Sequence, residues 1–113
     1  MSKMTSENQV IITGHVGAAP VLKSLDSGKQ VLRISLANNS YVNGVRRTHW
    51  YTIVLWNELA AVAATKIAKG DFVGFRGKLN TREFEGKDKT LYRITEILAD
   101  QFWLESEQLP LAG

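Results

Sequence analysis

Apolar and polar residues alternate in several segments of the chain with the two-residue period of β-strands. The alternation is clearest in Lys29–Asn38, where Leu32, Ile34 and Leu36 would face one side and Arg33 the other. The remaining segments are rich in β-branched or aromatic residues and are bounded by Gly, Pro, Asn or Asp. Together they predict five strands: Gln9–Val16, Lys29–Asn38, Thr48–Trp56, Asp71–Phe84 and Leu91–Leu104.

One segment, Asn57–Ala68, has helical spacing instead. Asn57 is predicted to be the N-cap, because its side-chain oxygen would accept a backbone N–H of the first turn. Gly70 is predicted to end the helix. The apolar stripe of this helix consists of Leu59, Val62, Ala63 and Ile67.

The connections carry turn signals. Asn43-Gly44 predicts a hairpin between the second and third strands, with a connection longer than two residues. Gly74 and Gly77, inside the fourth strand, indicate a bend or a close backbone approach, as at a barrel corner. Glu85–Thr90 is expected to be a polar loop before the last strand.

Three strands, a helix and two further strands follow one another in the order of an OB-fold. We therefore predict an all-β protein, a five-stranded OB-fold Greek-key barrel with one helix between strands 3 and 4. Residues 8–104 would form this domain, residues 1–7 an N-terminal extension, and residues 105–113 a short C-terminal tail.

The composition and charge of the chain limit the classes of function that it can have. The 113 residues suit one domain, and 44% hydrophobic with 22% charged residues is typical of globular proteins. The absence of cysteine excludes disulfides, thiolate metal sites and cysteine nucleophiles. The net charge of +3 is unevenly placed, because Ser27–Arg82 holds nine basic and two acidic residues. Such a basic stretch favours a polyanionic partner, either nucleic acid or an anionic membrane, with an ordinary solvated surface as the alternative.

The third predicted strand combines an aromatic face with an aliphatic face. Trp50 and Trp56 are an even number of residues apart, so they share one side of the strand. Ile53 and Leu55 take the opposite, core-like side. In the fourth strand one face carries Arg76, Lys78, Asn80, Arg82 and Phe84, opposite Val73, Phe75 and Leu79.

If these strands adjoin, their aromatic and basic faces form one surface suited to single-stranded nucleic acid. Aromatic rings stack on bases without regard to sequence, and cations neutralise phosphates. Arg46 and Arg47 belong to the basic stretch and lie beside Tyr41, which is expected either to contact nucleic acid or, as an aromatic residue at a strand end, to cover the barrel.

The other candidates favour structural roles. Phe72, Phe75 and Phe102 are assigned to the core, and Trp103 to an interface or a barrel end. His15 and His49 lack carboxylates at metal-ligand spacing and are expected to be ordinary strand side chains. Acidic residues are interpreted as a solvated hairpin (Glu83, Glu85 and Asp88) or as surface (Glu96, Asp100, Glu105 and Glu107). We expect no catalysis, metal or cofactor.

Over residues 8–104 the chain resembles bacterial single-stranded-DNA-binding proteins. The resemblance rests on an ordered set of short motifs: Asn8–Gly17 with Pro20, Ser27-Gly28-Lys29, Ile34–Ala37, Thr48-x-Trp50, Val54-Leu55-Trp56, Leu59-Ala60, Lys69-Gly70-x-x-Val73 and Gly77–Arg82. It implies an OB-fold homotetramer that binds single-stranded DNA in replication, repair and recombination. The location expected from it is the cytoplasm, in association with the nucleoid.

The resemblance also implies particular residues. Stacking positions fall on Tyr41, Trp50, Trp56 and Phe84, and basic positions near the DNA fall on Lys69 and Arg82. Arg76 and Lys78 rest on strand alternation alone. Tyr51 stands where members often have a histidine that packs the tetramer. The resemblance still favours a tetramer over a dimer, but it supports the tetramer less than it supports DNA binding.

The chain printed here ends at Gly113 without the Gly/Pro/Gln-rich linker and acidic tip that such proteins usually carry. We therefore expect a tail-less member in which tail-mediated recruitment of replication proteins is doubtful. Two alternatives stay open: a dimeric restart factor of the primosomal replication protein N type, and an OB-fold module that binds another protein.

Overall fold

The computed structural model describes residues 8–105, and these contain six strands and one helix. In chain order the elements are β1 (Val10–Val16), β2 (Val21–Ser24), β3 (Gln30–Val42), β4 (Val45–Trp56), α1 (Asn57–Lys66), β5 (Phe72–Glu85) and β6 (Leu91–Leu104). The predicted N-terminal extension (residues 1–7) and residues 106–113 of the predicted tail, including Glu107, lie outside the described residues.

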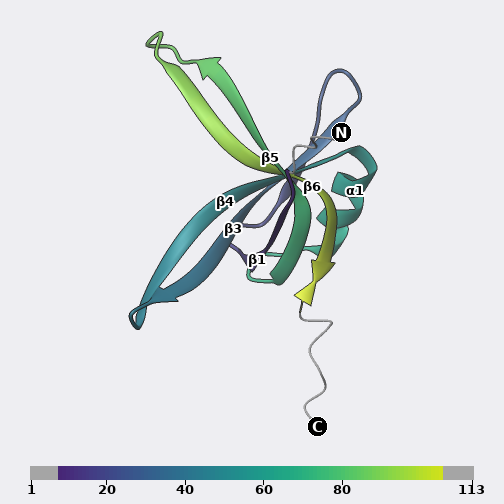
Figure 1. Ribbon diagram of the computed structural model, residues 1–113. Coiled ribbons are helices and arrows are strands. Elements are labelled where there is room, and N and C mark those ends of the chain that lie inside the picture. The colour runs from purple at the N-terminus through teal and green to yellow at the C-terminus, as the bar shows by residue number, and fades with distance from the viewer. Residues whose placement is uncertain (1–7, 106–113) are drawn as a thin grey trace, which may run out of the picture.

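The strands form one sheet in the order β1-β5-β6-β4-β3-β2, which closes through a second pairing between β1 and β3. Closure makes a barrel of β1, β5, β6, β4 and β3, with α1 between β4 and β5 (Figure 1). This confirms the predicted five-stranded OB-fold barrel and the place of its helix. The pairing of β4 with β6 is parallel, whereas all the other pairings are antiparallel.

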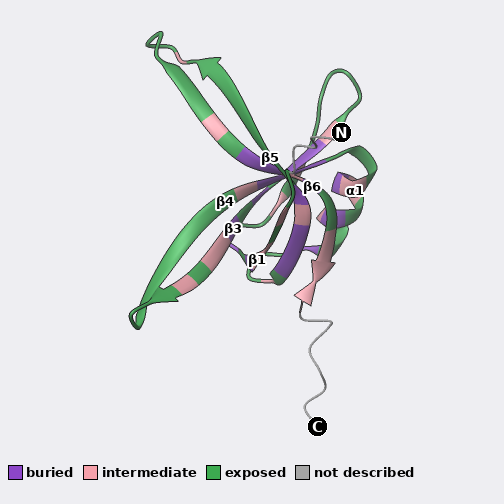
Figure 2. Ribbon diagram, in the orientation of Figure 1, coloured by how far each residue is buried: buried purple, intermediate pink, exposed green. Residues whose placement is uncertain are grey.

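Two long hairpins leave the barrel and diverge from each other. Figure 1 shows the β3–β4 and β5–β6 hairpins pointing away on different sides, and we call them arms. In Figure 2 the buried residues gather in the barrel and beneath α1, while the outer parts of both arms are exposed. The arms therefore provide surface, and the barrel supplies the core that holds them.

The core is filled by the inward-facing aliphatic residues that alternation predicts. Its largest fully buried side chains are Phe75, Leu32, Ile34, Leu36, Ile53, Leu55, Ile97 and Val73. Helix α1 adds Ala60 and Ala63 to the same cluster, and Ile67 joins it directly after the helix. The predicted helical stripe is partly wrong, because Val62 is exposed and Ala60 takes a buried place instead.

The strand inventory differs from the prediction in two places. Residues Val21–Ser24 form an additional strand, β2, which pairs with β3 and does not join the barrel. The connection at Asn43-Gly44 is shorter than predicted, because Val42 and Val45 already pair. Asn43 and Gly44 have φ angles of 52° and 79°, the left-handed conformation that a two-residue hairpin turn requires.

The start of α1 also differs from the prediction. Asn57 does not cap the helix, since its Oδ1 accepts the backbone N–H of Gln30 on β3 at 3.1 Å. Its φ of 55° turns the chain from β4 into the helix. The helix ends at Lys66, two residues before the predicted Ala68, and Gly70 follows with a φ of 91°.

Gly77 lies at the corner of the barrel, as strand glycines predicted. The register of β5 and β6 shifts between Arg76 and Gly77, where Asp100 is the extra residue of a β-bulge. A Cβ at Gly77 would collide with the backbone of Leu98 and Ala99. The extra residue lies on β6, so the alternation predicted along β5 is preserved.

Candidate nucleic-acid interface

The outer face of the β3–β4 arm carries the aromatic side chains. Cross-strand partners lie on the same face, and the register pairs Trp50 with Ala37, Trp56 with Val31, and Tyr41 with Arg46. Tyr41, Trp50 and Trp56 are 69%, 60% and 36% exposed, respectively. Ile53 and Leu55 on the opposite face are fully buried. The predicted arrangement, two tryptophans opposite an aliphatic pair, is confirmed.

The basic face of β5 belongs to the same surface. β6 lies between β4 and β5, and its residue Leu98 pairs with Val54 on one side and with Lys78 on the other. These three residues therefore share the outer face, together with Arg82 further along β5. The aromatic set and the basic set adjoin through β6, which alternation within single strands could not establish.

A hollow lies where the two arms meet. It is lined by Arg33, Val54, Trp56, Asn80, Arg82, Glu96 and Leu98. Arg33 and Arg82 both donate from Nε to the Glu96 carboxylate, at 3.5 Å to Oε2 and 3.3 Å to Oε1. We call these three residues the Arg–Glu–Arg triad. The assignment of Glu96 to the open surface is wrong, because its side chain is only 7% exposed.

Phe84 on the β5–β6 arm has an aromatic partner that the sequence analysis missed. Tyr92 pairs with Phe84 across the strands and stacks on it with ring centroids 5.4 Å apart. The Arg82 guanidinium lies 5.7 Å from the centroid of the Phe84 ring. The alternation of β6 would have indicated Tyr92, because it lies an even number of residues from Glu96 and Leu98.

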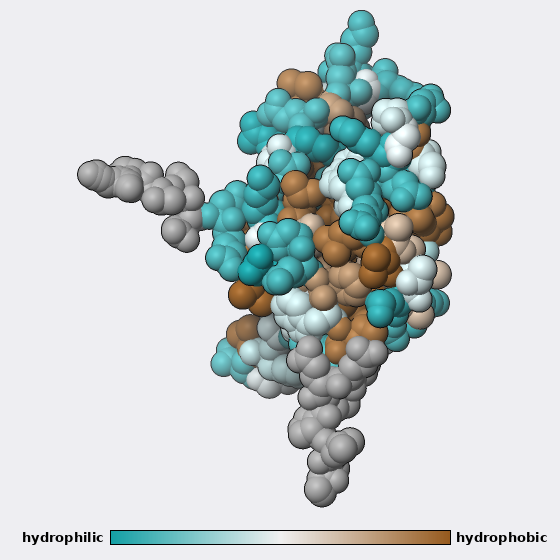
Figure 3. Space-filling view, turned by 90° about the vertical axis from the view of Figure 1, so that its right-hand side faces the viewer, coloured by the Kyte–Doolittle hydropathy of each residue, from teal (hydrophilic) through white to brown (hydrophobic). Residues whose placement is uncertain are grey.

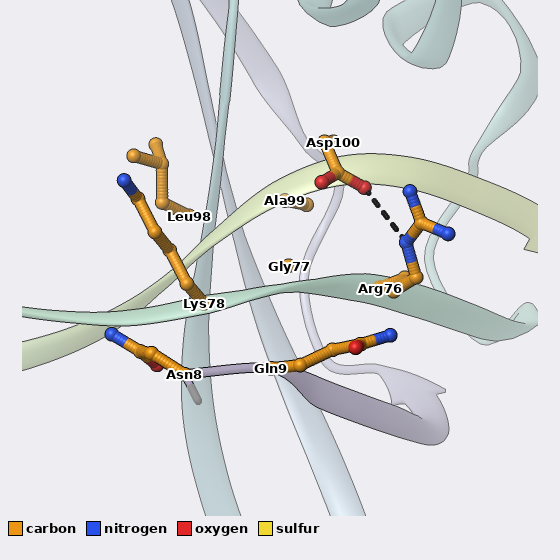
Figure 4. A pocket seen from close by; sticks show the side chains of 8 residues that line it. All are labelled: Asn8, Gln9, Arg76, Gly77, Lys78, Leu98, Ala99 and Asp100. Atoms are coloured by element: carbon orange, nitrogen blue, oxygen red, sulfur yellow. Dashed lines mark hydrogen bonds and ion pairs between the residues drawn. The ribbon is translucent and has the colours of Figure 1, made fainter. Parts of the chain in front are cut away.

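Arg76 and Lys78 project from the same side of β5 (Figure 4). Arg76 donates to Asp100 at 3.2 Å, so part of its charge is compensated. Lys78 and Arg76 line a second hollow, together with Asn8 and Gln9. Within residues 8–105 no acidic partner lies within ion-pair distance of Lys78, which leaves it available to an anion.

The remaining basic candidates are dispersed. Arg46 pairs with Tyr41 and shares the outer face of the β3–β4 arm. Arg47 pairs with Ser40 and therefore lies on the other face, with Tyr51. Lys69 lies in the turn between α1 and β5, where the Gly70 N–H donates to the Val16 carbonyl at the end of β1. The structure thus brings Arg46 beside the aromatic residues and separates Arg47 from them.

The other predicted aromatic residues lie away from the hollow at Trp56. Phe75 is fully buried and Phe102 packs against the core, as predicted. Phe72 is exposed instead, and stacks on His15 with centroids 4.8 Å apart. Trp103 covers Gly74, whose missing side chain leaves room for the indole. Trp103 therefore covers part of the barrel.

A model of the single-strand binding protein family matches residues 7–104. The chain belongs to this family. The match covers the whole barrel and both arms, and it confirms the resemblance seen in the sequence motifs. The face described above is therefore the aromatic and basic face of a single-strand binding protein family member.

Several curated proteins are similar to this family member. A single-stranded DNA-binding protein of Bacteroides thetaiotaomicron is 35% identical over 102 residues, which cover 84% of this chain and 63% of that protein. Single-stranded DNA-binding protein 2 of Streptococcus agalactiae is 35% identical, with coverage of 86% and 76%. A single-stranded DNA-binding protein of Neisseria meningitidis is 30% identical, with coverage of 85% and 58%. The chain thus spans about three fifths of two of these relatives.

Two carboxylates on the β5–β6 arm, Glu83 and Asp88, have hydrogen-bond partners on the same arm. Glu83 accepts from Arg93 at 2.9 Å, and Asp88 accepts the Thr90 backbone N–H at 3.0 Å and the Tyr92 hydroxyl at 3.1 Å. These bonds, the Thr90 backbone bond first, lower the pKa of Asp88 below its usual 3.8. Among the described residues no three His, Asp or Glu side chains gather as metal ligands would.

Helix α1 has 10 residues, and no helix among residues 8–105 has the length and apolarity needed to cross a membrane. The sequence left nucleic acid and an anionic membrane open as partners of the basic stretch. The match to the single-strand binding protein family favours the first.

Proposed function

We propose that this family member binds single-stranded DNA with little sequence preference. Bases stack on Tyr41, Trp50, Trp56 and Phe84, and phosphates contact the cations beside them. The observation that carries the proposal is the shared outer face, where exposed aromatic rings on one arm adjoin the basic strand of the other. The names of the curated relatives support the same ligand.

Each part of this face has a physical role in binding. Stacking of one base on an aromatic ring contributes about 1–3 kcal/mol and accepts any base. Each phosphate that a cation neutralises releases counterions, so the affinity falls as salt rises. A duplex hides the faces of its bases between neighbouring pairs. Binding through exposed rings therefore selects single strands.

The binding mechanism requires no catalytic step. The chain covers single strands that are exposed during replication, repair or recombination and protects them until the complementary strand is restored. This role places the protein in the bacterial cytoplasm, with the DNA. Lys69, Lys78, Arg46, Arg76 and Arg82 are the proposed phosphate contacts, and Arg47 has the weakest support among the predicted cations because it lies on the other face of its arm.

The chain further offers surfaces for self-association, and we propose a homotetramer. A tetramer with dihedral symmetry needs two different self-complementary patches on each chain. The first is a groove between the arms, lined by apolar residues that include Ile11, Tyr51 and Leu79. The second lies by the end of β6, where Leu59, Phe102 and Trp103 line a hollow. Figure 3 shows apolar side chains gathered on the face that carries α1 and the end of β6.

Tryptophan fluorescence tests the proposed ligand directly. Titration with a long thymidine oligomer is expected to quench Trp50 and Trp56 strongly at low salt and less at high salt, while a matched duplex has little effect. A Trp103→Phe variant retains most of the quenching. Unchanged fluorescence together with no retention on immobilised single strands would overturn the proposal and point to a protein partner. Sedimentation at several concentrations tests the tetramer, and a stable dimer or monomer contradicts it.

A further inference from the structure

The Arg–Glu–Arg triad has unused hydrogen-bonding capacity inside the proposed DNA-binding face. A carboxylate offers about four acceptor sites, two on each oxygen. The Arg33 Nε uses one site on Oε2 and the Arg82 Nε uses one on Oε1. Among the described residues no further donor bonds to Glu96. One acceptor site on each oxygen is therefore left over, although buried polar groups are normally satisfied.

The surroundings of Glu96 suit a base and not a phosphate. Glu96 lines the hollow beside Trp56, whose ring is a stacking surface, and Val54 and Leu98 line the same hollow with apolar groups. A phosphate in the hollow would be repelled by the carboxylate. A base stacked on Trp56 would instead turn its polar edge toward Glu96.

The two free acceptor sites select among the bases. Guanine carries two adjacent donors on its Watson–Crick edge, the N1–H and the N2 amino group, and these match the two oxygens of one carboxylate. Thymine offers one N–H between two carbonyl oxygens, and adenine and cytosine each offer one amino group beside a ring acceptor. Asn80, which lines the same hollow, supplies a side-chain amide that could donate to the guanine O6.

We infer that the hollow lined by Trp56, Asn80 and Glu96 is a guanine subsite within an otherwise unselective single-strand path, with the Glu96 carboxylate accepting from N1–H and N2–H. This inference rests on the proposed function, because it needs a bound single strand to present the base. Arg33 and Arg82 act as positioning residues that hold the carboxylate in its orientation.

The test compares thymidine oligomers of one length in which isolated thymines are replaced by guanine or by hypoxanthine. Hypoxanthine lacks only the N2 amino group of guanine, so it keeps the stacking surface and removes one of the two donors. The guanine oligomer is expected to bind about fivefold tighter than the thymidine oligomer, at the low end for a bidentate base contact. The hypoxanthine oligomer is expected to lose most of that gain.

Two variants assign the preference to Glu96. Glu96→Gln replaces one acceptor oxygen by a donor amide, and it is expected to bring the ratio of guanine-oligomer to thymidine-oligomer affinity down to about one. Glu83→Gln makes the same charge change on a strand position whose side chain faces away from Arg82, and it should keep the preference. Circular dichroism checks that both variants fold.

Each outcome decides one point. Equal affinity for the three oligomers overturns the guanine subsite and leaves single-strand binding intact. A preference that persists in Glu96→Gln assigns guanine recognition to other residues and also overturns the inference. Failure of the wild-type chain to bind any oligomer contradicts the proposed function itself. Should Glu96→Gln not fold, equal affinity for the guanine and hypoxanthine oligomers on the wild-type chain still overturns the inference.

Discussion

The indole of Trp50 lies over Gly17, and a Cβ at Gly17 would come within 2.5 Å of the ring. Gly17 follows β1, and its N–H donates to the Ser35 carbonyl on β3 at 2.8 Å. Gly17 is thus held in place by the barrel and forms a flat support under an exposed side chain. This support fixes the ring on the outer face before any base arrives.

Gly17→Ala is therefore expected to weaken single-strand binding by displacing the Trp50 ring. The loss of binding free energy should not exceed that of Trp50→Ala, which is expected to be about 1–3 kcal/mol for one stacked base. Stability should change little, because Gly17 does not adopt a left-handed backbone conformation. Fluorescence titration with a thymidine oligomer measures the affinity, and urea unfolding measures the stability.

A double-mutant cycle shows whether Gly17 acts through Trp50. In a Trp50→Ala background the added Gly17→Ala change should have no further effect on affinity, because the ring that it displaces is already gone. Equal losses in the two backgrounds would mean that Gly17 contributes to binding independently of the indole.

Arg46 and Arg47 provide a matched pair of variants with opposite expectations. Both are exposed and adjacent, yet Arg46 lies on the face of Tyr41 and Trp50, and Arg47 on the face of Tyr51. Arg46→Ala is expected to reduce the slope of log affinity against log salt by about 0.7, one phosphate contact of a single strand. Arg47→Ala should leave the slope unchanged. If both variants lower it equally, strand alternation does not determine which cation contacts DNA.

Strand alternation made much of this face predictable. Whether Trp50 points outward while Ile53 points inward depends only on their spacing along one strand, so local sequence sufficed for β4. The same holds for Arg82 and Phe84 on β5, since the bulge at Asp100 falls on β6 and does not disturb the alternation of β5.

Contacts between residues far apart in the sequence were not predictable in this way. Glu96 is buried because Arg33, 63 residues away, reaches it across β4. Asn57 does not cap α1 because Gln30, 27 residues away, donates to its side chain. In both cases the sequence identifies a competent polar group but not its partner, which only the folded sheet brings near.

As the pH is lowered, Asp88 at the tip of the β5–β6 arm is expected to become protonated only below the usual pKa of an aspartate. Hydrogen bonds from the Thr90 N–H and the Tyr92 hydroxyl lower the pKa of Asp88 from 3.8. A lowered folded-state pKa means that Asp88 stabilises the hairpin above its unfolded-state pKa and that this contribution is lost as pH falls through the folded value. NMR titration of the Asp88 carboxyl measures it.

Tyr92→Phe removes one of these donors and keeps the aromatic ring. It should raise the pKa of Asp88 toward 3.8 only in part, since the Thr90 backbone bond is the larger cause and remains. An unchanged pKa in this variant would show that the Tyr92 hydroxyl does not reach the carboxylate in solution.

A comparison of Glu96 with Asp100 tests how much burial increases the contribution of an ion pair to the free energy of unfolding. Both lie on β6 and pair with an arginine, but the Glu96 side chain is 7% exposed and that of Asp100 is 63% exposed. Removing the charge of Glu96 leaves two arginines of the triad without their shared acceptor. Glu96→Gln is therefore expected to lower the free energy of unfolding by roughly 1–3 kcal/mol. Asp100→Asn should lower it by less than about 0.5 kcal/mol, because surface ion pairs contribute little.

Urea unfolding measures the free energy of unfolding of both variants. The protein concentration is kept the same for both, because self-association changes the apparent stability with concentration. Both substitutions remove one negative charge from β6, so any general effect of net charge is the same in the two proteins. The gap between them then reports the burial of Glu96 together with its second arginine partner. Similar shifts would mean that the triad behaves as a solvated surface pair and is too weakly ordered to position a carboxylate for a base.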